Sequence, residues 1–201
     1  MTKQMNKPTL QRLLELHQLL LDFQAVDRIT VIPAKDHIKF ENDAEHSYSL
    51  AMTAWFLAQH FPELDRDKVI RIALAHDLVE VHSGDTSVFD HEMVATKEKR
   101  EARGTTQLAK DWPDFPQMHE AITDYKKRSS EEARFVYALD KIMPIILNIV
   151  SEGLSWRRHG VTLSELHAAK KDKVTHHPVV ADYYQQIYSL LSDSPHYFVN
   201  Q

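Results

Sequence analysis

The stretch Ala73-Leu74-Ala75-His76-Asp77-Leu78-Val79-Glu80 places two residues that can bind a metal side by side, with a further carboxylate one turn later. Val69 and Ala73 precede the pair at helical spacing, so His76 and Asp77 fall on the inward face of a predicted helix. Polar groups on a core face are costly unless they meet a partner of opposite charge. The stretch therefore indicates a buried site that could hold a cation.

Apolar side chains recur every three or four residues along most of the chain. This spacing predicts helices over residues 10–21, 50–61, 69–77, 133–147 and 183–191. The first of these helices should begin near Pro8 and Thr9, and Ser129 and Ser130 are candidate caps before Glu131 and Glu132. The alternation typical of a strand is almost absent, apart from residues 29–32, which we interpret as an extended turn before Pro33. The pattern predicts an all-α protein, a compact multi-helix bundle.

Length and composition narrow the possible functions. A chain of 201 residues is long enough for one buried core, so we predict a single domain over 1–201. The net charge of -5 offers no field that would gather a nucleic acid polymer. No apolar run is long enough for a membrane span, and no signal peptide is present, so we expect a cytoplasmic protein without membrane contact.

The residue types that are missing also direct the chemistry. The chain has no cysteine, so a metal must be held by histidine and carboxylate side chains. It has only four glycines, and none forms a glycine-rich phosphate loop. A phosphate group must therefore be bound by side chains or by a metal ion.

Two further residues that can bind a metal share an inward position. His46 lies one turn before the helix over 50–61, and Asp140 follows the apolar residues of its own helix at inward spacing. Taken alone, each has an ordinary explanation. His46 could be a hydrogen-bonded core histidine, and Asp140 could pair with Arg134 or Lys141. Taken with the adjacent histidine and aspartate described above, they could share one cation.

The order of His46, His76-Asp77 and Asp140 resembles the H…HD…D signature of the HD-domain metal-dependent phosphohydrolases. Their surroundings resemble more narrowly the branch that contains the 5'-deoxynucleotidases and related HD-domain proteins. The segments that carry this likeness are Ala44-Glu45-His46-Ser47, His76-Asp77-Leu78-Val79-Glu80 with Gly84-Asp85, and residues 130–141. The likeness covers roughly residues 10–147 and is weak beyond Ser151. We expect a motif-bearing core over about 10–150, with C-terminal helices in 151–201 packed on it.

The resemblance implies an HD-domain bundle with its metal site between helices. It implies one divalent ion, of which Mn, Co, Fe, Ni, Zn and Mg are all candidates. The ligands that it implies are His46, His76, Asp77 and Asp140. His82 and His91 could bind a second metal, as in some two-metal phosphodiesterases of this kind. The additional motif of those enzymes is absent here, so a single ion is preferred.

Three other residues receive roles from the same resemblance. Glu80 occupies the HDxxE position and would transfer a proton or orient the attacking water, whereas its ordinary alternative is a solvated helix residue. Asp85 matches a second acidic position near the substrate and could instead cap the next helix. Arg28 would bind phosphate, although relatives carry an aromatic residue after it and this chain has Ile29. The alternative for Arg28 is a surface residue paired with an acid.

The expected function is that of a metal-dependent phosphomonoesterase that releases phosphate from nucleoside 5'-monophosphates. Its substrate would be a small phosphorylated molecule, and the resemblance implies a homodimer. Two alternatives stay open at this point. One is a nucleotide-binding regulatory module without turnover, and the other is an HD hydrolase of a diphosphate or a cyclic phosphodiester.

Overall fold

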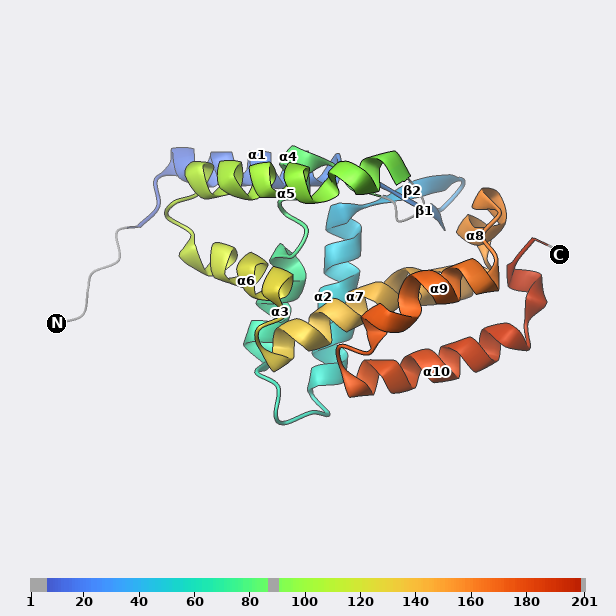
Figure 1. Ribbon diagram of the computed structural model, residues 1–201. Coiled ribbons are helices and arrows are strands. Elements are labelled where there is room, and N and C mark those ends of the chain that lie inside the picture. The colour runs from blue at the N-terminus through green and yellow to red at the C-terminus, as the bar shows by residue number, and fades with distance from the viewer. Residues whose placement is uncertain (1–6, 87–90, 200–201) are drawn as a thin grey trace.

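A computed structural model describes residues 7–86 and 91–199 of the chain, in which helices surround one small sheet (Figure 1). The N-terminal elements are α1 (Leu10–Gln24), β1 (Asp27–Pro33), β2 (Ile38–Asn42), α2 (Asp43–Ala58), α3 (Arg66–Ala75) and α4 (Glu80–Ser83). The elements that follow are α5 (His91–Asp111), α6 (Pro116–Lys127), α7 (Glu131–Val150), α8 (Leu154–His159), α9 (Leu163–Val174), α10 (Pro178–Ser192) and the short 3-10 helix η1 (Pro195–Tyr197). The predicted all-α class is confirmed.

Polar caps explain where several helices begin. Thr9 and Ser130 each accept a hydrogen bond from the backbone N–H three residues later, so they start α1 and α7 as predicted. At the start of α2, Asn42 and Glu45 form a reciprocal capping box. These bonds satisfy N–H groups that a helix cannot pair internally.

Residues 29–32 belong to a β-strand, so the interpretation of this segment as an extended turn was wrong. Strand β1 pairs antiparallel with β2 and connects α1 to α2 as a hairpin. Thr30 and Val31 are both buried, and the register shifts between Asp27 and Val31. This irregularity hides the alternation of inward and outward side chains by which a strand is recognised in sequence.

The core lies between α2, α3 and α7, with α6 and α9 packed beside them. Its largest fully buried aliphatic side chains include Leu50, Ile72, Leu139, Ile142 and Ile145. Burying one such side chain stabilises the fold by about 1.5–3 kcal/mol. The three central helices are therefore held firmly against one another, which fixes the polar residues that they carry.

Helix α3 ends at Ala75, two residues earlier than the predicted 69–77. His76 is its C-cap residue, and its backbone N–H still donates to the Ile72 carbonyl at 3.0 Å. The chain then turns and restarts as α4 at Glu80. The His76-Asp77 pair therefore lies at a helix end, where two adjacent side chains can turn to the same centre more easily than on a continuous helix.

The C-terminal helices contact the motif-bearing part of the chain. Helix α7 contacts α8, α9 and α10, and α8 also lies against β1. In Figure 1, α7, α9 and α10 lie along the lower side of the molecule. Over residues 7–86 and 91–199, no helix combines the length and the apolar character that crossing a bilayer requires.

Candidate metal centre

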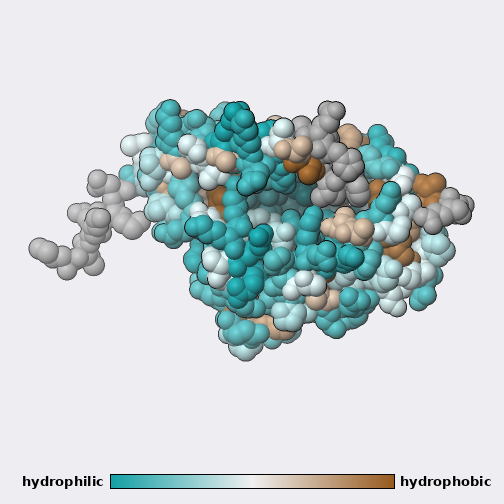
Figure 2. Space-filling view, in the orientation of Figure 1, coloured by the Kyte–Doolittle hydropathy of each residue, from teal (hydrophilic) through white to brown (hydrophobic). Residues whose placement is uncertain are grey.

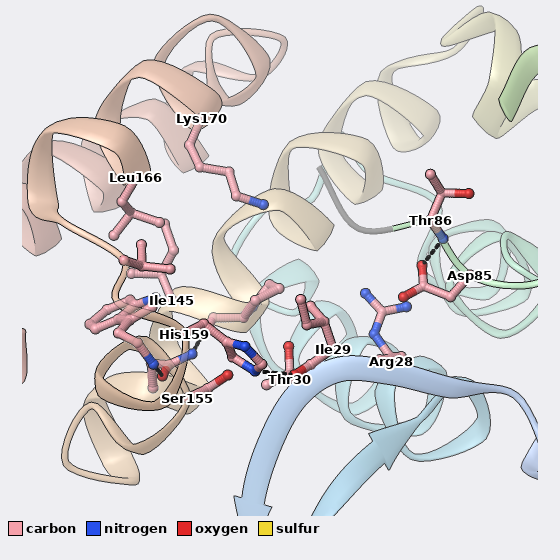
Figure 3. A pocket seen from close by; sticks show the side chains of 14 residues that line it. Arg28, Ile29, Thr30, Asp85, Thr86, Ile145, Ser155, His159, Leu166 and Lys170 are labelled. Carbon is pink, nitrogen blue, oxygen red and sulfur yellow. Dashed lines mark hydrogen bonds between the residues drawn. The ribbon is translucent and has the colours of Figure 1, made fainter. Parts of the chain in front are cut away.

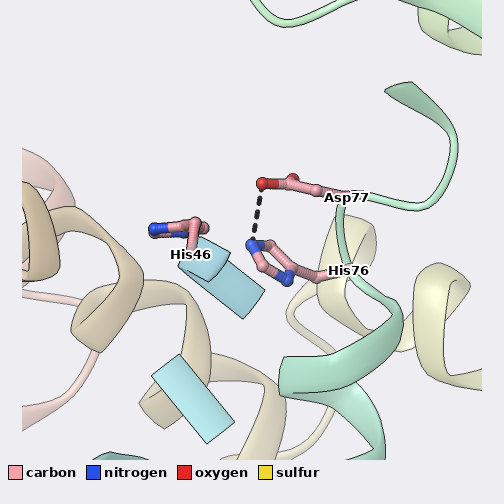
Figure 4. A group of neighbouring side chains, drawn as sticks. All are labelled: His46, His76 and Asp77. Carbon is pink, nitrogen blue, oxygen red and sulfur yellow. Dashed lines mark ion pairs between the residues drawn. The ribbon is translucent and has the colours of Figure 1, made fainter. Parts of the chain in front are cut away.

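The four predicted ligands converge on one buried point. The His46 Nε2 atom on α2 lies 2.9 Å from the Asp140 Oδ1 atom on α7. The His76 Nε2 atom lies 2.9 Å from the Asp77 Oδ2 atom and 3.9 Å from the same Asp140 oxygen. Figure 4 shows the adjacent His76 and Asp77, with their ion pair dashed, on one segment and His46 on another. Residues separated by almost a hundred positions thus form a single cluster.

Hydrogen bonds orient the two imidazoles toward this centre. The Nδ1 atom of His76 lies 2.8 Å from the Ala73 carbonyl, which can only accept, so Nδ1 carries the proton and the Nε2 lone pair faces the cluster. Burial, together with the charge of the nearby Arg28, lowers the pKa of His46 to about 4. His46 is therefore neutral, which is the form that binds a metal.

The carboxylate of Asp140 is fixed through its second oxygen. The Tyr125 hydroxyl donates to Oδ2 at 2.6 Å, and the Lys141 amine pairs with the same atom. Burial raises the pKa of Asp140, but Lys141 and His46 outweigh it and keep the pKa well below the usual value. The pairing with Lys141 that the sequence offered as an alternative is present, and it leaves Oδ1 directed at the histidines.

Buried polar atoms without a hydrogen bond show that the residues fit a divalent ion. His76 Nε2, Asp43 Oδ2 and Glu80 Oε2 are buried and accept or donate no hydrogen bond within the described residues. Ligand atoms of His46, His76 and Asp77 lie within 4.8 Å of one another, as do those of Asp43, Asp77 and Glu80. A cation would satisfy these atoms, and imidazole with carboxylate suits first-row divalent metals.

Asp43 was missed by the sequence reasoning. It lies in the first turn of α2, where an acidic residue is ordinarily a solvated favourable charge at the helix N-terminus. Here it is fully buried, and its Oδ1 atom accepts from the Arg28 Nη1 atom at 2.9 Å. Only its position after the inward-facing strand residue Glu41 hints at burial, and that strand was itself not recognised.

Glu80 is buried rather than solvated, with 4% of its surface exposed. Burial, together with the neighbouring carboxylates of Asp77 and Asp43, raises the pKa of Glu80 to about 11. In the metal-free protein Glu80 therefore carries a proton at neutral pH. A buried carboxyl that holds a proton beside a metal centre is suited to proton transfer.

Arg28 is buried beside the predicted ligands and is not a surface residue. Its guanidinium pairs with Glu41 at 3.5 Å, Asp43 at 2.9 Å and Asp77 at 3.3 Å. Burial lowers the pKa of Arg28, but Asp77 and Asp85 outweigh it, and the side chain stays charged. The hairpin of β1 and β2, which was not recognised in the sequence, holds the Arg28 guanidinium in place.

Asp85 lies close to Arg28 at the edge of the same site, as Figure 3 shows. Its Oδ1 atom accepts from the Thr86 backbone N–H at 2.7 Å. Residues 87–90, which lead from Thr86 to α5, lie outside the described residues. The alternative role of Asp85, as a cap of the next helix, falls on this segment and so also lies outside them. Asp85 thus lines the site, and its side chain is hydrogen-bonded to the backbone of the next residue.

His82, one of the two residues considered for a second metal, does not join the centre. The His82 Nε2 atom lies 3.8 Å from Asp111, on another face, and no potential metal group of the described residues includes it. The side chain of His91 lies outside the described residues.

A cavity of about 450 Å³ opens over the centre. Figure 2 shows a hollow in this face, surrounded mostly by hydrophilic side chains. Seven basic residues line the cavity, namely Arg28, Lys97, Lys126, Arg128, Lys141, Lys170 and Lys173. A neighbouring cavity of about 110 Å³, lined largely by apolar groups, shares Arg28, Asp85, Thr86, Pro144 and Lys170 with the first. The two cavities meet beside the metal centre.

The HD-domain family model matches residues 24–180, which is more than half of the chain, and the chain belongs to this family. The match passes Ser151, beyond which the sequence likeness had been expected to be weak, and it includes α8 and α9. The helical fold and the convergence of the HD motifs agree with this assignment.

Similar proteins come from several organisms. The 5'-deoxynucleotidase HDDC2 of Mus musculus is 32% identical over 110 residues, which is 54% of this chain and 54% of the mouse protein. The match thus spans about half the length of that relative. A solved structure of a predicted metal-dependent phosphohydrolase from Magnetospirillum magnetotacticum is 27% identical, with a TM-score of 0.76 over 94% of this chain and 96% of that one. A conserved hypothetical protein from Pyrococcus furiosus shares the fold at a TM-score of 0.64 and 23% identity, over 90% and 99% of the chains.

Proposed function

We propose that this protein is a divalent-metal-dependent phosphohydrolase that releases phosphate from nucleoside 5'-monophosphates. The observation that carries the proposal is the convergence of His46, His76, Asp77 and Asp140 below a cavity with basic walls. The likeness to the mouse 5'-deoxynucleotidase and to the bacterial predicted phosphohydrolase supports it. The cavity volume suits a small molecule.

The proposed ligands are His46, His76, Asp77 and Asp140. A divalent ion held by them would polarise a phosphoryl oxygen and lower the pKa of a bound water. Arg28 would neutralise charge on the phosphate, because its guanidinium is fixed beside the ligands and borders both cavities. These residues would therefore position the phosphorus atom for attack by water.

Glu80 and Asp85 are the proposed proton carriers. As water attacks phosphorus and the ester P–O bond breaks, the Asp85 carboxylate would accept the proton of the water. Glu80 would donate a proton to the departing alkoxide, because its carboxyl group is buried beside the proposed ligand Asp77. Ile29 stands where relatives carry an aromatic residue, so we propose no preference between ribose and deoxyribose.

The test is a substrate and metal screen. The protein is stripped with a chelator, reloaded with Mn, Co, Fe, Ni, Zn or Mg, and assayed for phosphate release from ribo- and deoxyribonucleoside 5'-monophosphates. Release with at least one metal and none after chelation is expected. The absence of release with every metal would contradict the proposal.

The same screen separates the alternatives. Thermal stabilisation by a nucleotide without phosphate release would indicate a regulatory module. Pyrophosphate or a linearised product from a diphosphate or cyclic substrate would indicate the other hydrolase reactions.

We further propose that residues 1–201 act as one domain and that the protein works as a cytoplasmic homodimer. Contacts of α7 with α8, α9 and α10 support the single domain. Large apolar side chains left exposed on α2 and α3, including Trp55, Phe56 and Leu74, support a protein contact there. Light scattering after size-exclusion chromatography tests the dimer, and a monomer at micromolar concentration would contradict it.

A further inference from the structure

Lys170 on α9 is a buried lysine without a partner among the described residues. Only 9% of its surface is exposed, and the described residues offer its amine neither an ion pair nor a hydrogen bond. A buried lysine is normally paired with an acid, because an isolated charge in a protein interior is costly. Lys170 therefore stands out from the other basic residues of the site.

The neighbouring lysines of the cavity show the contrast. Lys141 pairs with Asp140, and Lys97 and Lys126 both lie within 3.5 Å of Glu101. Each of these three lysines thus has an acidic partner within the protein, although Lys97 and Lys126 share one carboxylate. Apart from Arg128, which lies over the Tyr137 ring, the basic residues of the cavity without an ion pair in the described part of the chain lie on α9.

Lys173 lies one turn after Lys170 on the same face of α9, and it lines the larger cavity as well. The described residues give it no ion pair either. Lys171, between them in sequence, is exposed. The two lysines thus form a pair of like charges directed into one cavity.

Burial lowers the pKa of Lys170 to about 7, and repulsion from Lys141 and Lys173 adds to this effect. Burial and repulsion from Lys141 also lower the pKa of Lys173. An anion between these amines would relieve both the desolvation and the repulsion. The arrangement is unfavourable for the empty protein and favourable once an anion is bound.

The position of Lys170 indicates which part of a ligand it would meet. Figure 3 shows its amine directed into the cavity from α9, with Arg28 and Asp85 on the other side. Lys170 borders both the basic cavity over the metal centre and the smaller apolar cavity. An anionic group at this junction would have the metal ligands on one side and an apolar chamber on the other.

We propose that Lys170 and Lys173 bind the phosphate group of the substrate, from the side of the cavity opposite Arg28. This inference rests on the proposed phosphohydrolase function and adds to it two binding residues that lie outside the HD motifs. Lys170 makes the main contact because it is the more buried of the two. Lys173 adds a second charge from the cavity wall.

The first experiment measures the binding of inorganic phosphate by calorimetry, both to the chelator-treated protein and to the protein loaded with Mn. In Lys170→Met the affinity should fall by about tenfold or more in both states, because one charged hydrogen bond is lost. Lys173→Met should show a smaller loss. Lys171→Met removes the same charge from the exposed side of α9 and should bind phosphate as the unmodified protein does.

Stability and kinetics distinguish binding from a structural role. Methionine keeps the length of the lysine stem, so Lys170→Met should melt at the same temperature as the unmodified protein or higher. Its KM should rise more than its kcat falls, and Lys170→Arg should recover most of the phosphate affinity. Equal phosphate affinity in Lys170→Met and the unmodified protein, or a lowered melting temperature with unchanged binding, would overturn the inference.

The inference and the proposed function fail separately. Lys170-dependent phosphate binding by a protein that hydrolyses no substrate would uphold the binding site and contradict the hydrolase. Hydrolysis with the same KM in the unmodified protein and in Lys170→Met would uphold the hydrolase and contradict the role of Lys170.

Discussion

The two walls of the cavity differ in whether their charged side chains have partners within the protein. On the wall formed by α2, α3, α7 and the hairpin, partners hold the charged groups in place, as Tyr125 and Lys141 hold Asp140, and Asp43 holds Arg28. On the α9 wall, Lys170 has no partner within the described residues. The difference suits two kinds of ligand. A resident metal needs ligands that are already oriented, whereas a transient anion needs charge that is still available.

The largest effect should come from removing a ligand on the first wall. His76→Ala should lose bound metal, and phosphate release should fall to background, because two carboxylates and one imidazole no longer enclose the ion. Elemental analysis and the phosphate assay measure both effects. His82→Ala removes a histidine from outside the cluster and should retain both metal and activity. If His76→Ala keeps its full metal content, the proposed centre is wrong.

Glu80 tests the chemistry without changing the ligand set. Glu80→Gln should lower kcat by about a hundredfold or more, because the amide keeps the shape of the carboxyl but cannot give up a proton. Its metal content should stay the same. The matched control is Glu98→Gln, which changes an exposed glutamate on α5. A kcat within twofold of the unmodified protein would remove Glu80 from the proton transfer.

The effect of Arg28 on the free energy of unfolding tests the wall on which charged groups are paired. Arg28→Met leaves Asp43 and Glu41 buried without their cation, so the free energy of unfolding should fall by about 3 kcal/mol. Lys170→Met, by contrast, removes an unpaired charge and should cost no stability. Urea unfolding of the metal-free variants makes the comparison, and equal stability of the two variants would refute the distinction between the walls.

The cost of Arg28→Met should also depend on pH. Burial already raises the pKa of both Glu41 and Asp43 to about 7, and loss of the arginine raises them further. These groups bind more protons in the folded than in the unfolded chain, so stability falls as pH rises. The deficit of the variant should therefore be larger at pH 8 than at pH 6. A deficit that shrinks over this range would contradict the assignment.

The smallest effect is expected at Asp124, a paired acid outside the cavity walls. Hydrogen bonds from Ser130 and Ser129, with Lys68, overcome the effect of burial and lower its pKa to about 2. Its stabilisation is present above pH 4 and is lost as pH falls toward 2. Asp124→Asn should lower the free energy of unfolding by about 1–2 kcal/mol at pH 7 and by less at pH 3. Asp67→Asn, at an exposed position, is the control for urea unfolding.

Local patterns were sufficient for much of the helical fold. The starts of α1 and α7 follow from their caps and apolar spacing, since both depend on residues within one turn of each other. The hairpin was not recognised because a register shift and two adjacent buried residues, Thr30 and Val31, interrupt its alternation. The end of α3 was placed two residues late because apolar spacing continues beyond the last helical hydrogen bond.

The residues of the site also fall into two groups, those that the sequence identified and those that it did not. Inward spacing and the HD-family motifs named residues that the structure brings together, such as His46 and Asp140. Asp43 and Lys170 were not foreseen. An aspartate in a first helical turn and a lysine in the run Lys170-Lys171-Asp172-Lys173 both look like solvated charges in sequence. Their burial depends on helices that are distant in sequence and pack over them.

The amino-acid sequence by itself determined the helical class, several helix starts and the order of the motif residues, because these depend on neighbours a few positions apart. The tertiary structure alone decided that Arg28 is buried and paired, and that Lys170 is buried with no partner in the part of the chain that the structure describes. Whether a charged group is paired depends on which side chains from segments distant in sequence lie within bonding reach of it. The spacing of neighbouring residues along the chain does not contain that information.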